Sequence, residues 1–431
     1  MRITSISVTP VAVQDPPLLN SEGVHQTHAL RSIIKMTADD GSVGWGETYG
    51  DDIMLRWLGA VAERLVGIDV LDVHRIEAVV DAELDAGVHE EVAAAPAGAG
   101  YPMADAASAK TRAAVLSAFE VPCLDLIGKS LGVPVSALLG GARRDRVDYS
   151  AYLFYKWAEH PGRPYAADSW GEVLDAAAMV GEARRMVDEY GFRSLKVKGG
   201  VLTPAEEVET VRALRAEFPT LPIRIDPNAA WTVDVAVAVG EALEGDLEYL
   251  EDPVAGTAAM AEVARRVKMP LATNMCVTAF EDLPEAVREG APQVILSDHH
   301  FWGGLRRSVQ LDTLCHTFGI ELSMHSNTHL GISLAAMTHF GAVSRSLAYS
   351  CDTHTPWQTE DVLAAETPLR FEGGAVRVPT APGLGIEVDE DAVARLHQQW
   401  RECGVRTRDD VTPMRAVDPT WTGDVPRFTT L

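Results

Sequence analysis

Cysteine is scarce in this sequence, with five residues among 431, and no two of them form a CxxC pair. Their spacing therefore gives no sign of a paired-thiol site. All five stand in apolar or mixed surroundings, which is typical of buried, unreactive thiols. They are Cys123, Cys276, Cys315, Cys351 and Cys403.

Basic residues are also few: 37 Lys and Arg stand against 62 Asp and Glu, for a net charge of −25. This balance argues against binding to nucleic acids or to anionic membranes, because both need a positive protein surface. It does not exclude a small anionic substrate, since a Mg²⁺ ion or a few Arg and Lys side chains can reverse the field locally. We therefore expect a small-molecule partner, and neither nucleic acid nor membrane.

Long apolar runs are missing too, and none approaches the roughly 18–20 residues that a membrane-spanning helix needs. The first residues, MRITSISVTPVAV, alternate like a strand and lack the basic and apolar regions of a signal peptide. We therefore expect a cytoplasmic protein. Its content of 47% hydrophobic and 23% charged residues is ordinary for a globular chain with a large core.

What the sequence does contain is a series of short apolar segments that each end in a polar residue. These polar residues follow one another at intervals of 23 to 28 residues, about the length of one strand, one helix and two loops. In a (β/α) barrel the ends of successive parallel strands line one mouth, where the chemistry is carried out. The segments end at Lys198, Asp226, Glu251, Asn274, Asp298 and His325.

The regions around this series have other patterns. Residues 1–50 alternate like strands, with a hairpin turn at Asp40-Gly41, and residues 53–135 are helical in pattern. From residue 147 strands and helices alternate, beginning with a strand over 147–154. We predict three units: an N-terminal α+β unit, a (β/α) barrel and a C-terminal segment. Their ranges are 1–140, 141–370 and 371–431.

Two helices of the barrel carry clear end signals. One is expected to end at Gly191. The next has Thr203 as its N-cap residue, Pro204 at its first position and Glu206 placed to complete a capping box.

Lys196 and Lys198 are two residues apart on a strand, so their side chains share a face. Two ammonium groups side by side, near a metal, repel each other. The repulsion is expected to favour the neutral form of one lysine and so to supply a general base.

Asp226, Glu251 and Asn274 offer oxygen atoms at the ends of three consecutive strands. Oxygen ligands suit Mg²⁺, with water and substrate completing an octahedron. None of the three is His or Cys, which disfavours zinc.

Asp298 and His325 end the next two strands, close enough for a hydrogen bond that fixes the imidazole tautomer and raises its basicity. With a lysine base opposite and a Mg²⁺ site between, this arrangement suits removal of a proton beside a carboxylate. The metal would stabilise the enediolate, and the opposite residue would protonate a leaving hydroxyl or the other face. Four other histidines lack such placement and are expected to be structural: His299, His300, His329 and His339.

Across nearly its whole length the chain resembles the enolase superfamily, and in particular its glucarate dehydratase branch, a superfamily whose Mg²⁺ chemistry is well known. Asn274 as a third metal ligand and the His-Ser-Asn sequence at 325–327 are typical of that branch. The segments that carry the resemblance are KVKGG (196–200), IDPNAAWT (225–232), LEDP (250–253), ATNM (272–275), SDHHFWGG (297–304), MHSNTHLGISLA (324–335) and CDTHTPWQ (351–358).

The resemblance implies an α/β fold: a modified (β/α)7β TIM-type barrel under an α+β capping domain that the N-terminal and C-terminal segments form together. It implies Mg²⁺ on Asp226, Glu251 and Asn274. It also implies Lys198, with Lys196 beside it, and His325, paired with Asp298, as the two bases. Asn228 would contact the intermediate. Substrate-binding positions would be His25, Tyr152, Ser326, Asn327, His354 and Arg408.

The implied reaction is a Mg²⁺-dependent dehydration of an acid sugar, D-glucarate and also L-idarate, to 5-dehydro-4-deoxy-D-glucarate, by a homo-oligomer. The chain departs from the resemblance over residues 85–112, at His299 where a proline is expected, and beyond residue 410. A dehydratase or epimerase for a different acid sugar therefore stays open. A catalytically silent sugar-acid-binding homologue is the alternative of another class, although no base or metal ligand is missing.

Overall fold

A sheet of seven parallel strands forms the centre of the molecule, and each strand pairs with the next along the chain. The computed structural model describes residues 1–91, 109–162, 168–366 and 369–431. Every residue of the first six strands is buried, as continuous apolar runs of parallel strands require. The strands are β5 (Ala151–Phe154), β6 (Leu195–Lys198), β7 (Ile223–Asp226), β8 (Tyr249–Glu251), β9 (Leu271–Thr273), β10 (Val294–Ser297) and β11 (Glu321–Met324).

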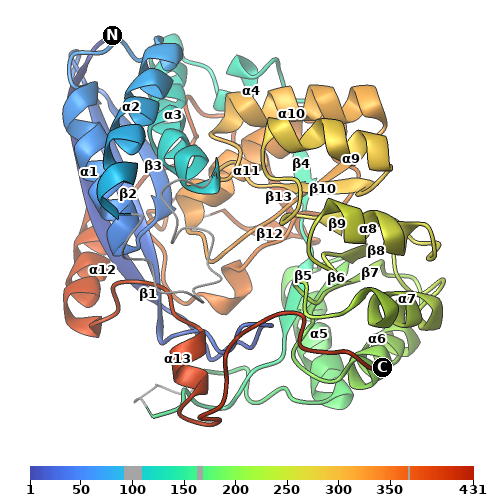
Figure 1. Ribbon diagram of the computed structural model, residues 1–431. Helices are drawn as coiled ribbons and strands as arrows, with labels where there is room; N and C mark the ends of the chain where they lie inside the picture. Colours follow the sequence, from blue (N-terminus) through green and yellow to red (C-terminus); the bar gives the residue numbers. More distant parts are fainter. Residues whose placement is uncertain (92–108, 163–167, 367–368) are drawn as a thin grey trace.

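A helix follows each of these strands and covers the outside of the sheet (Figure 1). The end signals of two of them are confirmed. Thr203 Oγ1 accepts a hydrogen bond from the Glu206 amide, and the Glu206 carboxylate accepts one from the Thr203 amide. Gly191 ends the helix before it with a φ of 72°. The helices are α5 (Ala176–Tyr190), α6 (Pro204–Glu217), α7 (Val233–Ala242), α8 (Thr257–Ala264), α9 (Leu283–Glu289), α10 (Leu305–Phe318) and α11 (Gly331–Val343).

Residues 346–352 close the barrel as an eighth stave. On one side Leu322 of β11 donates its amide to the Ser346 carbonyl (2.8 Å) and accepts the Ala348 amide (3.1 Å). On the other side Ser150 donates its amide to the Cys351 carbonyl (2.8 Å), just before β5. Seven strand–helix units followed by a last strand segment make the (β/α)7β barrel, and the predicted fold class is confirmed.

The prediction of one continuous strand over residues 147–154 is wrong. The chain forms β4 (Arg146–Asp148), which pairs with β13 (Ala375–Arg377), and then enters the barrel as β5. At the junction Tyr149 donates its amide to Gly374, whereas Ala151 donates to Ser194. Each half of the run therefore belongs to a different sheet. The hairpin partner of β13 is β12 (Phe371–Glu372).

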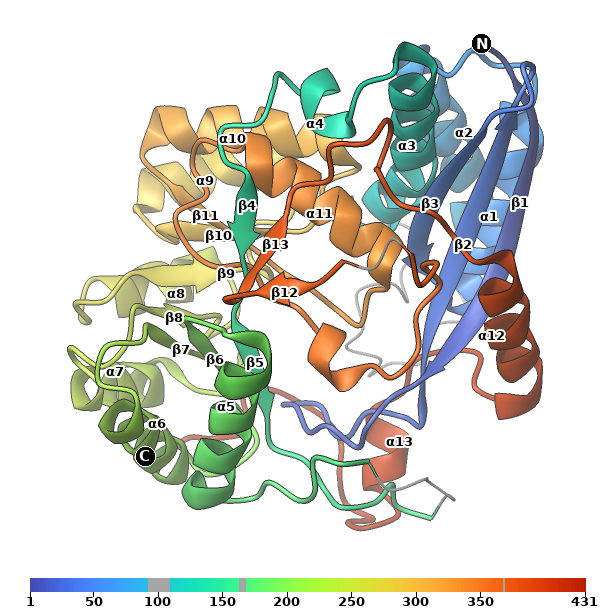
Figure 2. The ribbon, with the colours of Figure 1, turned by 180° about the vertical axis from the view of Figure 1, so that it is seen from behind.

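A separate antiparallel sheet lies over the mouth of the barrel (Figures 1 and 2). Its second and third strands meet at the predicted Asp40-Gly41 turn, where Gly41 has a φ of 82°. Helix α12 (Glu390–Cys403), drawn in red, packs against its first strand in both views, so the two ends of the chain build this capping domain together. Its other elements are β1 (Ile3–Gln14), β2 (His28–Ala38), β3 (Val43–Tyr49), α1 (Asp52–Leu65), α2 (Val73–Glu91), α3 (Ala109–Leu131) and α4 (Val135–Leu138).

The C-terminal segment contacts both parts of the molecule. Helix α12 lies on the capping sheet and is followed by α13 (Val411–Met414), whereas the final residues reach the barrel. There the amides of Arg427 and Phe428 donate to the Ala230 carbonyl at 2.8 and 2.9 Å. The unit boundaries at residues 140 and 370 stay a prediction.

The structure shows the state of the five cysteines and the apolar character of the helices. All five cysteines are free thiols; Cys123, Cys315 and Cys351 are buried, and Cys276 and Cys403 are half-buried. Burial raises the pKa of Cys276 and of Cys315 to about 12, which keeps both thiols protonated. Among the described residues, no helix combines the length and the apolar character that crossing a membrane demands.

Candidate active site

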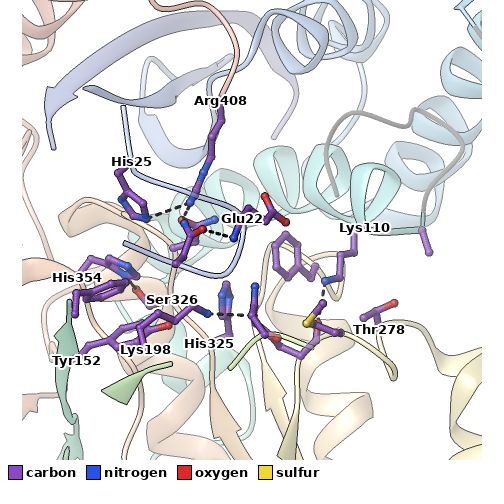
Figure 3. Close-up of a pocket in the computed structure, with 18 residues that line it drawn as sticks. Glu22, His25, Lys110, Tyr152, Lys198, Thr278, His325, Ser326, His354 and Arg408 are labelled. Atoms are coloured by element: carbon purple, nitrogen blue, oxygen red, sulfur yellow. Dashed lines mark hydrogen bonds between the residues drawn. The ribbon is translucent and has the colours of Figure 1, made fainter. Parts of the chain in front are cut away.

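The carboxyl ends of the barrel strands surround a cavity of about 370 Å³ that the capping domain covers. Figure 3 shows Lys198 and His325 on the barrel side, with Glu22, His25 and Arg408 reaching in from the opposite side. Ten of the fourteen predicted site residues line the cavity. The other four lie directly behind this lining and bond to it or to one another; they are Lys196, Asp226, Glu251 and Asp298.

The three predicted metal ligands lie on β7, on β8 and just after β9, three neighbouring strands. Carboxylate oxygens of Asp226, Glu251 and the adjacent Asp252 lie within 4.8 Å of one another. Glu251 Oε2 and Asn274 Oδ1 are buried and have no hydrogen-bond partner among the described residues. Buried oxygens without a donor are costly unless a cation or water completes them, so the set fits a hard divalent ion.

Asp252 is a site residue that the sequence analysis missed. Strand alternation would turn it away from Glu251, but β8 ends at Glu251 and Asp252 has a φ of 36°, which turns its side chain back. Its carboxylate accepts hydrogen bonds from the Thr273 hydroxyl and the Asn274 amide (2.9 Å), and so fixes the end of β9. Burial, and then the Asp226 charge, raise the pKa of Asp252 to about 7.

The prediction of a neutral lysine included a nearby metal ion and stays a prediction; the side chains alone hold both lysines charged. Lys198 Nζ donates to Asp226 Oδ2 at 2.6 Å, and Lys196 Nζ donates to Glu251 and Asp352 at 2.7 Å each. Burial lowers the pKa of both lysines, but these carboxylates outweigh it, and both pKa values lie above the ordinary lysine value. The carboxylates therefore hold both ammonium groups charged. Asp352 lies in the segment 351–358 and was not predicted as a site residue.

A left-handed turn brings Asn228 back toward Lys198. Asn228 and Ala229 have φ values of 52° and 61°, a conformation that asparagine tolerates and alanine rarely adopts. The Asn228 amide bonds to Asp226 Oδ1 (3.0 Å), and its side-chain oxygen accepts from Lys198 Nζ (3.1 Å). Lys198 is thus held between the predicted metal ligand and Asn228.

The predicted Asp–His pair is formed. His325 Nδ1 lies 3.0 Å from Asp298 Oδ2, and since a carboxylate only accepts, Nδ1 carries the proton. The other ring nitrogen, Nε2, is then a base. Burial lowers the pKa of His325, although Asp298 opposes this, so the imidazole is neutral at neutral pH.

A cluster of polar side chains occupies the capping side of the cavity. Arg408 donates to Asn327 Oδ1 (2.8 Å) and Asp410 Oδ2 (2.7 Å), and its guanidinium lies 3.2 Å from His25 Nε2. His25 in turn lies 3.0 Å from Asp15. Three of the predicted substrate contacts, which are far apart in sequence, therefore meet at one place.

Tyr152, Ser326 and His354 form a second group on the barrel wall. Ser326 Oγ lies 3.0 Å from His354 Nδ1, and the His354 ring packs edge-on against Tyr152 at 5.0 Å. Burial raises the pKa of the Tyr152 hydroxyl to about 12, although Lys196 opposes this, so the hydroxyl stays a hydrogen-bond donor.

Two further charged residues at the cavity were missed. Lys110, at the start of α3, donates to the Asn274 carbonyl (2.8 Å) and lies over the Phe301 ring. Glu22 lies in the loop between β1 and β2. Neither stands in a periodic pattern. Residues 92–108 of the divergent 85–112 segment lie outside the described residues.

Comparison with known proteins identifies the family. Residues 178–392 match the family model described as "Enolase C-terminal domain-like". A probable glucarate dehydratase from Streptomyces coelicolor is 49% identical over 99% of both chains. A D-galactarolactone cycloisomerase from Agrobacterium fabrum is 26% identical over 84% of this chain and 90% of its own.

Solved structures agree over the full length. An enolase from Mycobacterium smegmatis in complex with tartrate is 53% identical, covering 99% of this chain and 98% of its own, with a TM-score of 0.92. An enolase from Pseudomonas fluorescens with bound magnesium, potassium and tartrate is 44% identical over 99% of both chains, with a TM-score of 0.95. The chain therefore belongs to the enolase superfamily, in the branch that holds its probable glucarate dehydratase relative.

Proposed function

We propose that this protein is a Mg²⁺-dependent acid-sugar dehydratase that converts D-glucarate, and also its C5 epimer L-idarate, to 5-dehydro-4-deoxy-D-glucarate. The observation that carries the proposal is the order of groups around the mouth. Lys198 ends β6, the three oxygen donors follow on the next three strand ends, and His325 comes after β11. Two proton-transfer groups thus flank a divalent-ion site.

Mg²⁺ would be held by Asp226, Glu251 and Asn274, whose buried oxygens include two that lack donors. When bound, the ion would neutralise the negative charge that develops on the substrate's carboxylate and, by engaging Asp226, weaken the hold of that carboxylate on the Lys198 proton. The structure of the enolase from Pseudomonas fluorescens, with its bound magnesium, supports this choice of ion.

Lys198 and His325, on either side of the ion site, would transfer the protons. The two C5 epimers present their C5 hydrogens on opposite faces, so one faces Lys198 and the other faces His325 Nε2. His325 is suited to accept the hydrogen because Asp298 holds its Nδ1 proton. Removal of the C5 proton from either epimer gives the same enediolate, which expels the C4 hydroxyl as water with a proton from whichever of the two residues lies beside that hydroxyl.

The far end of the substrate meets the Arg408 cluster. The positive charge of the guanidinium suits the second carboxylate of a six-carbon diacid. Asp410 bonds Nε and Nη2 of Arg408 and Asn327 bonds Nη1, which fixes the orientation of the guanidinium. This arrangement favours a diacid over a sugar acid with one carboxylate.

A panel of acid sugars tests the proposal. Purified protein with Mg²⁺ is incubated separately with D-glucarate, L-idarate, other hexarates and six-carbon aldonic acids, and 2-keto-acid formation is followed. We expect product from D-glucarate and L-idarate. Product from another acid sugar alone would favour a different dehydratase of the superfamily, and no product from any hexarate would refute the proposal. A cytoplasmic location and a homo-oligomeric state stay predictions.

A further inference from the structure

The histidine two residues after Asp298 is bonded to the other side of the same carboxylate. His300 Nδ1 lies 2.8 Å from Asp298 Oδ1, and the His300 amide donates to that oxygen at 2.9 Å. Asp298 Oδ2 is used by His325. His300 and Asp298 are 2% and 3% exposed, so bulk solvent competes little for these bonds. One carboxylate thus joins two imidazoles, and His300, which was expected to be structural, is bonded to a predicted site residue.

The proton on His300 Nδ1 is fixed by its surroundings. Asp298 can only accept, so Nδ1 must donate in every protonation state that forms this bond. The other ring nitrogen lies 3.2 Å from Arg31 Nη2, which can only donate, and 3.2 Å from the Ser333 hydroxyl. The Glu47 carbonyl lies 3.1 Å away. The ring is therefore anchored on both sides.

The groups that anchor His300 belong to the capping sheet and to α11. Arg31 on β2 bonds Glu47 on β3 at 2.7 Å, and Glu47 accepts the amides of Leu330 and Ser333 at the start of α11. The Tyr49 ring meets His300 edge-on at 5.4 Å. A buried polar chain thus runs from the capping sheet through His300 and Asp298 to His325.

We propose that His300 is a positioning residue for the His325 base: it holds Asp298 in the orientation that aims His325 Nε2 into the cavity, and it ties that orientation to the capping sheet. This inference rests on the proposed function. Lys198 has separate anchors, Asp226 and Asn228, so the proton transfer on its side does not depend on His300.

Hydrogen exchange at C5 in D₂O distinguishes proton transfer by His325 from proton transfer by Lys198. D-Glucarate and L-idarate are incubated with enzyme and Mg²⁺, and deuterium at C5 is measured by NMR. The epimer whose exchange is lost in His325→Asn is the His325 epimer. We expect His300→Leu to slow exchange of that epimer by about 10- to 100-fold, the cost of a small misplacement of a catalytic group. Exchange of the other epimer should stay within about twofold of the wild-type rate.

Two further variants serve as controls for this result. His300→Asn places an amide donor near Asp298 and should restore part of the lost exchange. His339→Gln is the matched control, because His339 is as buried as His300 but bonds to Ser136 and Leu384 instead of Asp298. It should change neither rate. Equal slowing of both epimers by His300→Leu, or no slowing of either, would overturn the proposal.

A second readout needs no substrate. In His300→Leu and in His300→Asn, the pKa of His325 is followed by NMR of the imidazole. Loss of the His300 hydrogen bond leaves more negative charge on the Asp298 oxygen that faces His325, so His300→Leu should raise the pKa of His325 and His300→Asn should raise it less. An unchanged pKa would contradict the inference. Failure of the wild type to exchange either epimer would instead contradict the proposed function.

Discussion

At the scale of single residues, two side chains are assigned the proton transfers. Lys198→Ala and His325→Ala should each lower turnover by about 10²- to 10⁴-fold, the usual contribution of a general acid or base. The fold should be retained, as circular dichroism will show. Lys268→Ala is the matched control, since Lys268 is 77% exposed and pairs with Glu244 on the surface. Turnover by either site variant at the wild-type rate would refute the assigned roles.

Metal affinity at the residue scale depends on Asn274. Asn274→Leu keeps the volume of the side chain but removes the buried oxygen that lacks a donor. We expect the affinity for Mg²⁺, measured by calorimetry, to fall by about 10-fold or more. Met275→Leu changes a neighbour that offers no oxygen and should leave affinity unchanged. Equal affinities of Asn274→Leu and the wild type would remove Asn274 from the ligand set.

The sequence predicted these residues wherever they end a periodic strand. The position of strand ends around one barrel mouth explains the regular spacing of Lys198, Asp226, Glu251 and His325. Asp252 was missed because its position depends on a positive φ that alternation does not show. The pairing of the lysines with carboxylates was not predicted: Asp226 contacts both lysines, and Asp352 contacts Lys196.

At the scale of elements, the capping box of α6 gives a local test. Thr203→Ala removes the hydroxyl that accepts the Glu206 amide, and should cost about 1 kcal/mol of the free energy of unfolding. Activity should be unchanged, because the box lies at the outer end of the β6–α6 loop. Thr203→Asp restores an acceptor and should recover most of the loss. A Thr203→Ala variant as stable as the wild type would show that the cap contributes nothing.

Element boundaries were less predictable than element types. The run 147–154 reads as one strand, although its polar residues, Asp148 and Ser150, both lie in its first half. The hydrogen bonds to Gly374 and Ser194 decide the change of sheet at Tyr149–Ser150. The last stave, residues 346–352, carries an apolar run of only three residues (347–349), too short to mark a strand. Backbone bonds join it to β11 and to residues 148 and 150.

At the scale of the whole molecule, buried neutral histidines make stability depend on pH. His339 accepts the Ser136 amide at Nδ1 (3.2 Å), and its Nε2 lies 3.1 Å from the Leu384 carbonyl. Burial lowers the pKa of His339 to about 4, below its unfolded value of about 6.5. Between these values the unfolded chain binds more protons. The contribution of neutral His339 to the free energy of unfolding is therefore complete above pH 6.5. It is lost as the pH falls, by up to about 3 kcal/mol.

The matching experiment compares urea unfolding from pH 7 to pH 4.5. His339→Gln cannot be protonated and keeps a donor and an acceptor, so its stability should fall less steeply than that of the wild type. His316→Gln, at an exposed histidine, should follow the wild type. Identical slopes for His339→Gln and the wild type would contradict this account.

The complete fold could be predicted from the sequence only through its resemblance to a known family. Periodicity predicts a barrel, but the placement of α12 on β1 joins residues nearly 400 positions apart, and no local pattern encodes it. The same holds for Arg408, which meets His25 only because the C-terminal segment returns to the capping loop.

The most direct test of the central claim is an anomalous difference map from a crystal soaked in Mn²⁺, which takes the same oxygen ligands as Mg²⁺. The account predicts one strong peak in contact with Asp226, Glu251 and Asn274, with Lys198 and His325 on opposite sides of it. A peak elsewhere, or an Asn274 side chain turned away from the ion, would contradict it.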